Sequence, residues 1–231
     1  MVSRLLYRDG LMLVIDKPAG LAVHAGPRNS KQRGESVEDH FDALRFGLPR
    51  APALAHRLDR DTSGCLVLGR HRKALAQLGK LFRSGSIGKV YWAAVEGAPA
   101  TDEGVIELAL GRLDETRGWW MKHDPKGRPA ITKWRVMGKS GNLTWLALEP
   151  LTGRTHQLRV HCAEMGWPIL GDAIYGNAPR DGGPPLHLHA REIVVPLYKT
   201  RAPIRVLAPL PHHMRAALTQ CGWRGANHPP P

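Results

Sequence analysis

The decisive stretch is His56-Arg57-Leu58-Asp59-Arg60-Asp61-Thr62-Ser63-Gly64, which stands directly before the apolar run Cys65-Leu66-Val67-Leu68. Its charged and hydroxyl side chains and its glycine are typical of a turn, whereas the apolar run predicts a buried strand. Polar turns at the edge of a sheet often carry functional residues, so we consider Asp59 a candidate catalytic carboxylate. The alternative is a solvated loop in which Asp59 pairs with an arginine or caps a helix.

Length and composition indicate a globular chain. Its 231 residues, of which 42% are hydrophobic, suffice for one large domain or two closely packed lobes. The apolar runs are far shorter than the roughly 18 residues of a membrane span, and no signal peptide is evident, so we expect no membrane anchor and a cytoplasmic location. The cysteines Cys65, Cys162 and Cys221 are too widely spaced to suggest a zinc site or a disulfide framework.

The chain is strongly basic, with a formal net charge of +13. Phosphate neutralisation and counterion release supply most of the sequence-independent affinity of proteins for nucleic acid, so this charge favours a polyanionic partner. Charge alone does not distinguish RNA from DNA or from an anionic membrane. Residues 26–34 carry three positive charges and are expected to form an exposed basic loop.

The hydrophobic pattern predicts a mixture of strands and helices. Two hairpin signals, around residues 9–10 and 138–142, indicate antiparallel β-structure in both halves of the chain. Strands are expected over residues 5–7, 11–15, 65–68, 89–95, 104–110, 131–137, 143–149, 192–197 and 204–207. Helices are expected over residues 36–48, 74–82, 155–165 and 214–221.

Two of these elements carry candidate site residues. Alternation along the strand 89–95 places Tyr91 on one face of a sheet. In the helix 155–165, Arg159 projects about 100° away from Leu158, so it need not lie in the core. The apolar line of this helix consists of Leu158, Cys162 and Met165.

Several other kinds of site are excluded by spacing. No G-x-G-x-x-G or G-x-x-x-x-G-K-[ST] motif supports a nucleotide cofactor, and Ser63 does not lie in a G-x-S-x-G elbow. His156 and His161 are five residues apart, the wrong offset for one helical face, while His187 and His189 have no obvious third ligand. What remains is a site of carboxylate, tyrosine and arginine that needs neither cofactor nor metal.

The stretch at residues 56–64 resembles the signature motif of the RluA-type RNA pseudouridine synthases. Further stretches agree with this family and follow its order, so that the resemblance runs from about residue 5 to residue 211. They are Asp16-Lys17-Pro18-Ala19-Gly20-Leu21 with Val23-His24, Lys89-x-Tyr91-x-Ala93-x-Val95-x-Gly97, Ala130-x-Thr132, Gly153-Arg154-Thr155-His156-Gln157-Leu158-Arg159-Val160-His161, Gly166-x-Pro168-Ile169-Leu170-Gly171-Asp172 with Tyr175-Gly176, and Ala208-Pro209-Leu210-Pro211.

The resemblance implies both a fold and a reaction. The fold is α+β, a mixed, mainly antiparallel β-sheet flanked by helices, with an RNA-binding cleft across its middle. The reaction is the isomerisation of uridine to pseudouridine in RNA, in which the bond from N1 to C1′ breaks, the base rotates, and C5 joins C1′. No redox or group-transfer cofactor is required.

The resemblance and the demands of this reaction assign roles to particular residues. Asp59 is the expected nucleophile or base, and attack on C1′, addition to C6 and removal of a sugar proton all remain open. Tyr91 is the expected platform for the flipped base, since stacking on an aromatic ring is worth roughly 1–3 kcal/mol per base. Arg159 is the expected cation partner of Asp59, because a nearby positive charge keeps an enclosed carboxylate ionised.

Three further residues belong to the expected substrate-binding set. Arg57 is expected to enter the RNA as the base flips out, because a guanidinium can stack and bond at the vacated place. His56 and Thr62 are expected chiefly to shape the turn that presents Asp59. In the polar stretch 111–129, Trp119 and Trp120 either stack on RNA bases or pack in the protein.

The expected partner is a stem-loop in ribosomal or transfer RNA, bound by a monomer. Many family members carry an N-terminal S4 RNA-binding domain, whereas here the motifs begin within the first twenty residues, so we expect specificity to lie in the loops 26–34 and 111–129. A catalytic domain is expected over residues 1–222 and a disordered tail over 223–231. The alternatives are a non-catalytic RNA-binding or ribosome-assembly protein and an RNA N-glycosidase.

Overall fold

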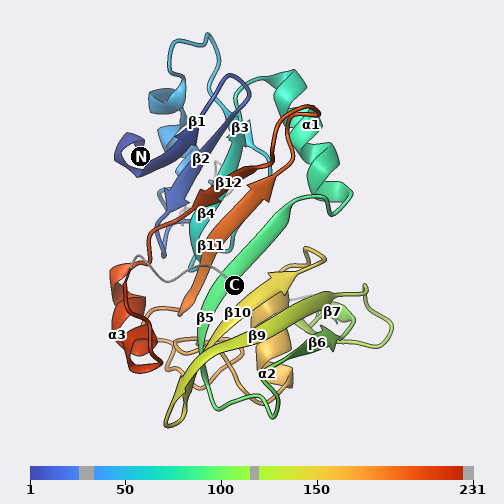
Figure 1. Ribbon diagram of the computed structural model, residues 1–231, viewed down its shortest axis with the longest axis vertical. Coiled ribbons are helices and arrows are strands. Elements are labelled where there is room, and N and C mark those ends of the chain that lie inside the picture. Colours follow the sequence, from blue (N-terminus) through green and yellow to red (C-terminus); the bar gives the residue numbers. More distant parts are fainter. Residues whose placement is uncertain (26–33, 115–119, 226–231) are drawn as a thin grey trace. The chain divides into compact units, whose positions relative to one another are not determined.

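The computed structural model describes residues 1–25, 34–114 and 120–225, which fall into two compact units (Figure 1). The first unit contains Met1–Lys89 and Ala190–Pro209, and the second contains Val90–His189 and Leu210–Pro231. The strands β5 (Gly88–Glu96) and β11 (Leu188–Val195) each contribute residues to both units. The basic loop expected over residues 26–34 lies, apart from Gly34, outside the described residues.

The first unit is built on a sheet in which β1, β2, β4 and β11 follow one another, with β3 added to β4 and β12 added to β11. The predicted N-terminal hairpin and the predicted buried strand after the charged turn are confirmed, since β2 pairs antiparallel with both β1 and β4. The bounds of these elements are β1 (Leu5–Arg8), β2 (Met12–Lys17), β3 (Ala53–Leu54), β4 (Ser63–Gly69), β12 (Ile204–Leu207) and helix α1 (Arg72–Arg83).

The core of the first unit lies where α1 covers this sheet. Leu78 of α1 is fully buried and belongs to the same cluster as Met12 of β2 and Val67 of β4. Two 3-10 helices, η1 (Val2–Arg4) and η2 (Val37–Leu44), complete the unit.

Two predictions for this unit need correction. The helix expected over residues 36–48 is a 3-10 helix that ends at Leu44, because Phe46 and Gly47 adopt positive φ angles of 43° and 82°. The strand expected over residues 192–197 begins earlier, at Leu188, and nearly all of its residues are buried. Its first residues alternate apolar and ionisable side chains, but His189 and Arg191 are buried, which their polarity did not suggest.

The second unit is built on a sheet with the strand order β5, β10, β9, β6, and it contains a separate hairpin of β7 and β8. The predicted second hairpin is confirmed as β9 and β10. The bounds of the elements are β6 (Glu103–Glu107), β7 (Leu110–Arg112), β8 (Met121–His123), β9 (Ile131–Ser140), β10 (Leu143–Pro150), α2 (Gln157–Glu164) and α3 (His212–Gln220).

The sheet of the second unit is covered on both faces. Successive side chains of a strand point to opposite faces. Accordingly, Leu146 and Leu148 of β10 pack in one cluster with Leu158 of α2. Trp145 and Ala147 of the same strand pack in another cluster with residues of α3, among them Met214 and Leu218.

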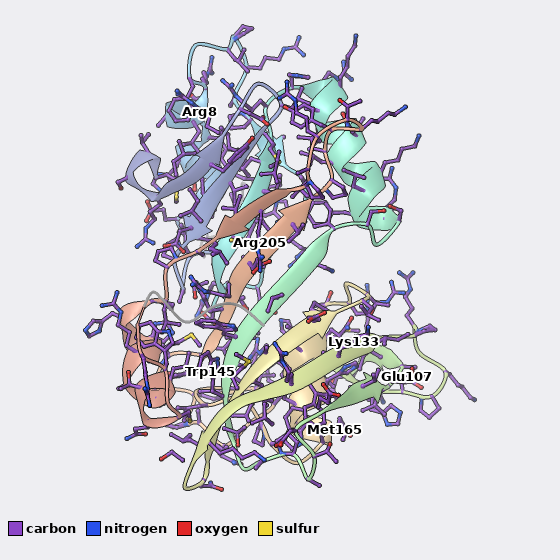
Figure 2. All side chains as sticks on the ribbon, in the orientation of Figure 1. Arg8, Glu107, Lys133, Trp145, Met165 and Arg205 are labelled. Carbon is purple, nitrogen blue, oxygen red and sulfur yellow. The ribbon has the colours of Figure 1, made fainter. Side chains whose placement is uncertain are left out.

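Some boundaries in the second unit differ from the predictions. The strand expected over residues 104–110 is divided between β6 and β7, and β8 arises within the polar stretch 111–129 that gave no strand signal. The helix expected to reach residue 165 ends at Glu164, and Met165, expected on its apolar line, is 45% exposed (Figure 2). Gly166, with a φ of 82°, reverses the chain directly after it.

Candidate active site

The charged stretch forms a turn at the start of β4, as predicted. The backbone N–H of Thr62 donates to the carbonyl oxygen of Asp59 across 3.2 Å, and Asp59 itself is half-buried. Gly64 has a φ of 106°, and a Cβ atom at this position would stand against the backbone of Ala190. Only glycine combines a positive φ with the absence of a Cβ atom, so Gly64 determines where the turn joins the buried strand.

A buried lysine holds this turn. The side chain of Lys17, at the end of β2, is 0% exposed. Its Nζ donates to the carbonyl oxygens of Pro18, Leu21 and Arg60, at 2.8, 2.7 and 2.8 Å. Every ammonium hydrogen therefore has an acceptor, and the path of the turn is tied to β2. Burial lowers the pKa of Lys17 to about 8.

His56 lies at the other end of the turn and contacts the sheet. The backbone N–H of Val67 donates to its Nε2 across 3.0 Å, so this nitrogen carries no proton. The imidazole stacks on Phe82 of α1, with ring centroids 4.5 Å apart. Burial, aided by the positive charge of Lys89, lowers the pKa of His56 to about 3. The structure thus places His56 as a neutral ring wedged between the sheet and α1.

The two remaining candidates in the stretch have opposite environments. Arg57 is exposed to solvent, beside Asp59 in the sequence. Thr62 is 2% exposed, and its Oγ1 has no hydrogen-bond partner among the residues that the structure describes. Arg57 is therefore accessible to a bound RNA, whereas the position of Thr62 is that of a residue packed within the turn.

Tyr91 lies on β5 in the second unit and is half-buried. It packs against the cluster that contains Ala93 and Leu158, while Trp92 faces the cluster on the opposite side of the sheet. The predicted alternation along this strand is therefore confirmed. Tyr91 is paired in register with Leu148 of β10.

Arg159 is buried, in contrast to the expectation that it could lie outside the core. The residue is 4% exposed, and its guanidinium donates through Nε and Nη2 to the two carboxylate oxygens of Asp172, each across 2.7 Å. Asp172 also accepts hydrogen bonds from the backbone N–H groups of Ile174 and Tyr175. Burial acts to raise the pKa of Asp172, but these hydrogen bonds and the arginine charge outweigh it and lower the pKa. A bidentate carboxylate explains how the arginine is tolerated inside the protein.

Next to this pair lies a second network, centred on the hydroxyl of Tyr175. The backbone N–H of Met121 donates to this oxygen across 2.9 Å, and the oxygen lies 2.8 Å from Nδ1 of His156. The oxygen thus accepts from the Met121 N–H and shares a second hydrogen bond with the His156 ring. The guanidinium carbon of Arg159 lies 5.2 Å from the Tyr175 ring centre.

His156 holds an unusual backbone conformation in this network. Its φ of 52° is in the left-handed region, directly before the first residue of α2. This conformation is uncommon for residues other than glycine and is found where the surroundings impose it. The hydrogen bond to Tyr175 supplies such a constraint, so the start of α2, the loop 172–176 and β8 are held together.

The other predicted candidates are buried or lie outside the described residues. His161 is fully buried between Thr132 and the carbonyl oxygen of Leu108, and burial lowers its pKa. Trp120 packs against Arg180, whose guanidinium carbon lies 5.3 Å from the ring centre, while Trp119 is not among the described residues. Within the described ranges there is no group of three His, Cys, Asp or Glu residues placed to hold a metal ion.

Residues 11–164 match the RNA pseudouridylate synthase family. The chain belongs to this family. An uncharacterized RNA pseudouridine synthase of Zymomonas mobilis is 41% identical over 214 residues, which cover 91% of this chain and 95% of the relative. Ribosomal large subunit pseudouridine synthase C of Vibrio cholerae is 35% identical over 224 residues, covering 94% of this chain and 67% of the relative.

A solved structure agrees with these matches. Human RNA pseudouridylate synthase domain containing 4 superimposes with a TM-score of 0.77 at 26% identity, covering 95% of this chain and 93% of the human chain. The resemblance and the fold predicted from the sequence are thus confirmed, and the pseudouridine synthase is an isomerase that acts on uridine in RNA. None of the helices in the described ranges has the length and apolar character that a membrane span requires.

Sequence reasoning missed the partners that hold the candidate residues. Lys17 and Asp172 were recognised only as members of motifs, and no role was assigned to Tyr175. A lysine at the end of an apolar strand was a usable signal, because a charge there is buried only if it is fully hydrogen-bonded. The pairing of Arg159 with Asp172 had no such signal, since the aspartate lies outside the helix.

Proposed function

We propose that this synthase isomerises a uridine in a stem-loop of large-subunit ribosomal RNA, with Asp59 as the catalytic carboxylate. The charge of +13 supports an RNA substrate, and two relatives, from Vibrio cholerae and Haemophilus ducreyi, are named ribosomal large subunit pseudouridine synthases. A stem-loop in transfer RNA is the second candidate. The cytoplasm is the proposed location, although some relatives carry names that place them in mitochondria.

The observation that carries the catalytic assignment is the anchored turn. The Lys17 ammonium is bonded to the carbonyl of Arg60, the residue after Asp59, and interacts electrostatically with Asp61 and Asp59. A nearby cation favours the ionised form of a carboxylate, which a nucleophile or base requires once RNA excludes water. A turn that is tied to the sheet also keeps the carboxylate in one position, as efficient catalysis demands.

Other residues bind and position the substrate in this proposal. Tyr91 receives the flipped uracil on its ring, and Arg159 supports the ionised Asp59. Arg57, which is exposed, takes the place that the base leaves in the RNA. His56 and Thr62 act through the shape of the turn. The overall isomerisation consumes no co-reactant: the C5 proton is lost, N1 gains a proton, and one glycosidic bond replaces another.

The substitution Asp59→Asn tests the assignment, with Asp61→Asn as a matched control in the same turn. We expect wild type and Asp61→Asn to form pseudouridine in ribosomal RNA transcribed in vitro, and Asp59→Asn to form none. RNA affinity is expected to stay within a few fold in both variants, because the carboxylate acts on the reaction and not on the phosphate backbone. Pseudouridine formation by Asp59→Asn at the wild-type rate would refute the assignment.

The competing hypothesis is a protein that keeps the fold but only binds RNA, for example in ribosome assembly. It predicts that wild type leaves every uridine unmodified. An RNA N-glycosidase would instead release uracil, which is detected by chromatography of the reaction mixture. Mapping pseudouridine in total RNA from cells with and without the gene identifies the RNA and the position together.

A further inference from the structure

Helix α1 carries four charged residues, all of them cationic and exposed to solvent: Arg72, Lys73, Lys80 and Arg83. With 100° per residue, Arg83, Lys80 and Lys73 lie about 20°, 80° and 100° from Arg72 around the helix axis. The four cations thus share one arc of about 100°. The buried residues Ala74 and Leu78 lie on the other side, toward the core.

The helix dipole explains only half of this arrangement. Lys80 and Arg83 lie in the last turn, where the partial negative charge of the helix end favours cations. Arg72 and Lys73 are the first two residues of the helix, where the partial positive charge disfavours them, and no acidic residue stands in this turn. A cationic first turn is therefore a feature that helix stability does not account for.

None of the four cations forms an ion pair with a carboxylate in the described part of the chain. Other exposed cations of the protein do have such partners. Arg45 lies 2.8 Å from Asp42, and Lys139 lies 3.2 Å from Asp102. The charge on the outer face of α1 is thus not compensated by neighbouring carboxylates, so it is available to an external anion.

Two small residues lie in or beside this arc. Ala76 lies about 40° from Arg72, between the cations, and Gly79 lies about 20° beyond Arg72, just outside the arc. Glycine is a poor residue for a helix interior. At position 79 its lack of a side chain makes room for Arg83, whose Nη1 would lie only 3.2 Å from a Cβ atom there. The guanidinium can therefore lie along the helix, and a nucleic-acid backbone can approach between the cations.

We propose that this basic face of α1, defined by Arg72, Lys73, Lys80 and Arg83, binds the phosphate backbone of the substrate RNA. From Arg72 to Arg83 the face is about 16 Å long, enough to follow several successive phosphates. Contacts of this kind fix the orientation of the RNA without reading its sequence. The inference rests on the proposed RNA substrate and adds a binding surface separate from the Asp59 turn.

The test compares two double variants that remove the same charge. Arg72→Gln/Lys73→Gln alters the basic face, and Arg45→Gln/Lys139→Gln alters two exposed cations that already have carboxylate partners. Affinity for a fluorescein-labelled RNA stem-loop is measured by anisotropy over a series of salt concentrations. We expect the first variant to bind several-fold more weakly at low salt, with the slope of log K against log salt reduced by one to two. We expect less than a twofold change for the second.

Two further measurements separate binding from folding and from catalysis. Thermal unfolding is expected to be unchanged or raised in Arg72→Gln/Lys73→Gln, because the substitutions remove cations from the positive end of the helix. The turnover rate at saturating ribosomal RNA is expected to equal that of wild type. Equal losses of affinity in the two variants, or none in either, would overturn the proposal. Absence of turnover in wild type would refute the proposed function and leave the binding result valid.

Discussion

Each unit buries a cation that belongs to the proposed site or supports it, and the hydrogen-bonding groups of these two cations are satisfied in different ways. In the first unit, Lys17 donates only to main-chain carbonyl oxygens, at 2.7 to 2.8 Å. In the second, Arg159 faces a carboxylate, that of Asp172, with two hydrogen bonds of 2.7 Å. Neutral acceptors fix the path of a loop, and the charge of Lys17 is offset only by carboxylates that it does not hydrogen-bond, such as Asp61 and Asp59, whereas a hydrogen-bonded carboxylate compensates the charge directly and fixes two side chains.

The comparison predicts that removing the carboxylate has the larger effect. Asp172→Asn removes the carboxylate that accepts two hydrogen bonds from the buried guanidinium of Arg159, so the free energy of unfolding should fall by about 3–5 kcal/mol. Asp102→Asn is the matched control, because its partner Lys139 and the carboxylate itself are exposed. The control should lose less than about 1 kcal/mol. Urea denaturation followed by circular dichroism measures both.

The double variant Arg159→Met/Asp172→Leu sharpens this test. Replacing both charges with apolar side chains should restore part of the stability, because no uncompensated charge stays buried, while the backbone N–H groups of Ile174 and Tyr175 lose their carboxylate acceptor. Pseudouridine formation should remain impaired if Arg159 supports Asp59 as proposed. If the double variant had full activity, Arg159 and Asp172 would have only a structural role, and the proposed support of Asp59 by Arg159 would be refuted.

The cation of the first unit gives a smaller effect. Lys17→Met removes the charge and leaves three carbonyl groups without their donor, and each buried unsatisfied group costs about 1–3 kcal/mol before the loop relaxes. We expect a net loss near the lower part of that range, together with a large loss of turnover because the Asp59 turn is released. If Lys17→Met lowered the free energy of unfolding as much as Asp172→Asn does, the proposed difference between carbonyl and carboxylate acceptors would be wrong.

The pH dependence of stability distinguishes the wild type from Lys17→Met. Burial lowers the pKa of Lys17 from 10.5 to about 8, so the folded protein releases this proton near pH 8 and the unfolded chain near pH 10.5. Between these values the unfolded chain binds more protons, and the contribution of Lys17 to stability therefore rises with pH. The free energy of unfolding is measured at pH 8 and pH 10 for both proteins. The rise between these pH values that comes from Lys17 should be present in wild type and absent from Lys17→Met.

The same two sites show how far the sequence could predict the structure. The turn around Asp59 and the buried strand after it followed from the change between charged and apolar residues, since that pattern is local. The partners of Lys17 are main-chain carbonyls, one of them 43 residues away. Every residue type has such a carbonyl, so the amino-acid sequence does not reveal these partners. Only the folded chain brings them together.

The burial of Arg159 was not predicted, for a related reason. Helical geometry allowed it to lie outside the core, but Asp172, from a loop 13 residues further on, makes burial favourable. Strand β8 was missed because three residues in a polar stretch carry too short a pattern to detect. Motif resemblance identified the family and supplied the residues of the proposed site, whereas the pairs that hold those residues depend on tertiary contacts.

Tyr175→Phe should have the smallest effect, and it tests whether the buried pair of the second unit is linked to the β7 and β8 hairpin. The substitution keeps the ring beside Arg159 and removes the oxygen between His156 and Met121, a loss of about 1 kcal/mol. If the hairpin contacts RNA, KM should rise several-fold while kcat changes little, because β8 is no longer held while Asp59 is unaffected. The measurement is the steady-state rate of pseudouridine formation at varied RNA concentration.

Tyr198→Phe is the matched control for this last prediction. Its hydroxyl donates to Asp9 across 2.8 Å in the first unit, so the variant loses one tyrosine hydrogen bond in a half-buried position, compared with two in Tyr175→Phe. It should show a similar loss of stability with no change in KM. A rise in KM confined to Tyr175→Phe would then come from the network of His156, Tyr175 and Met121, and an equal rise in both variants would assign it to general destabilisation.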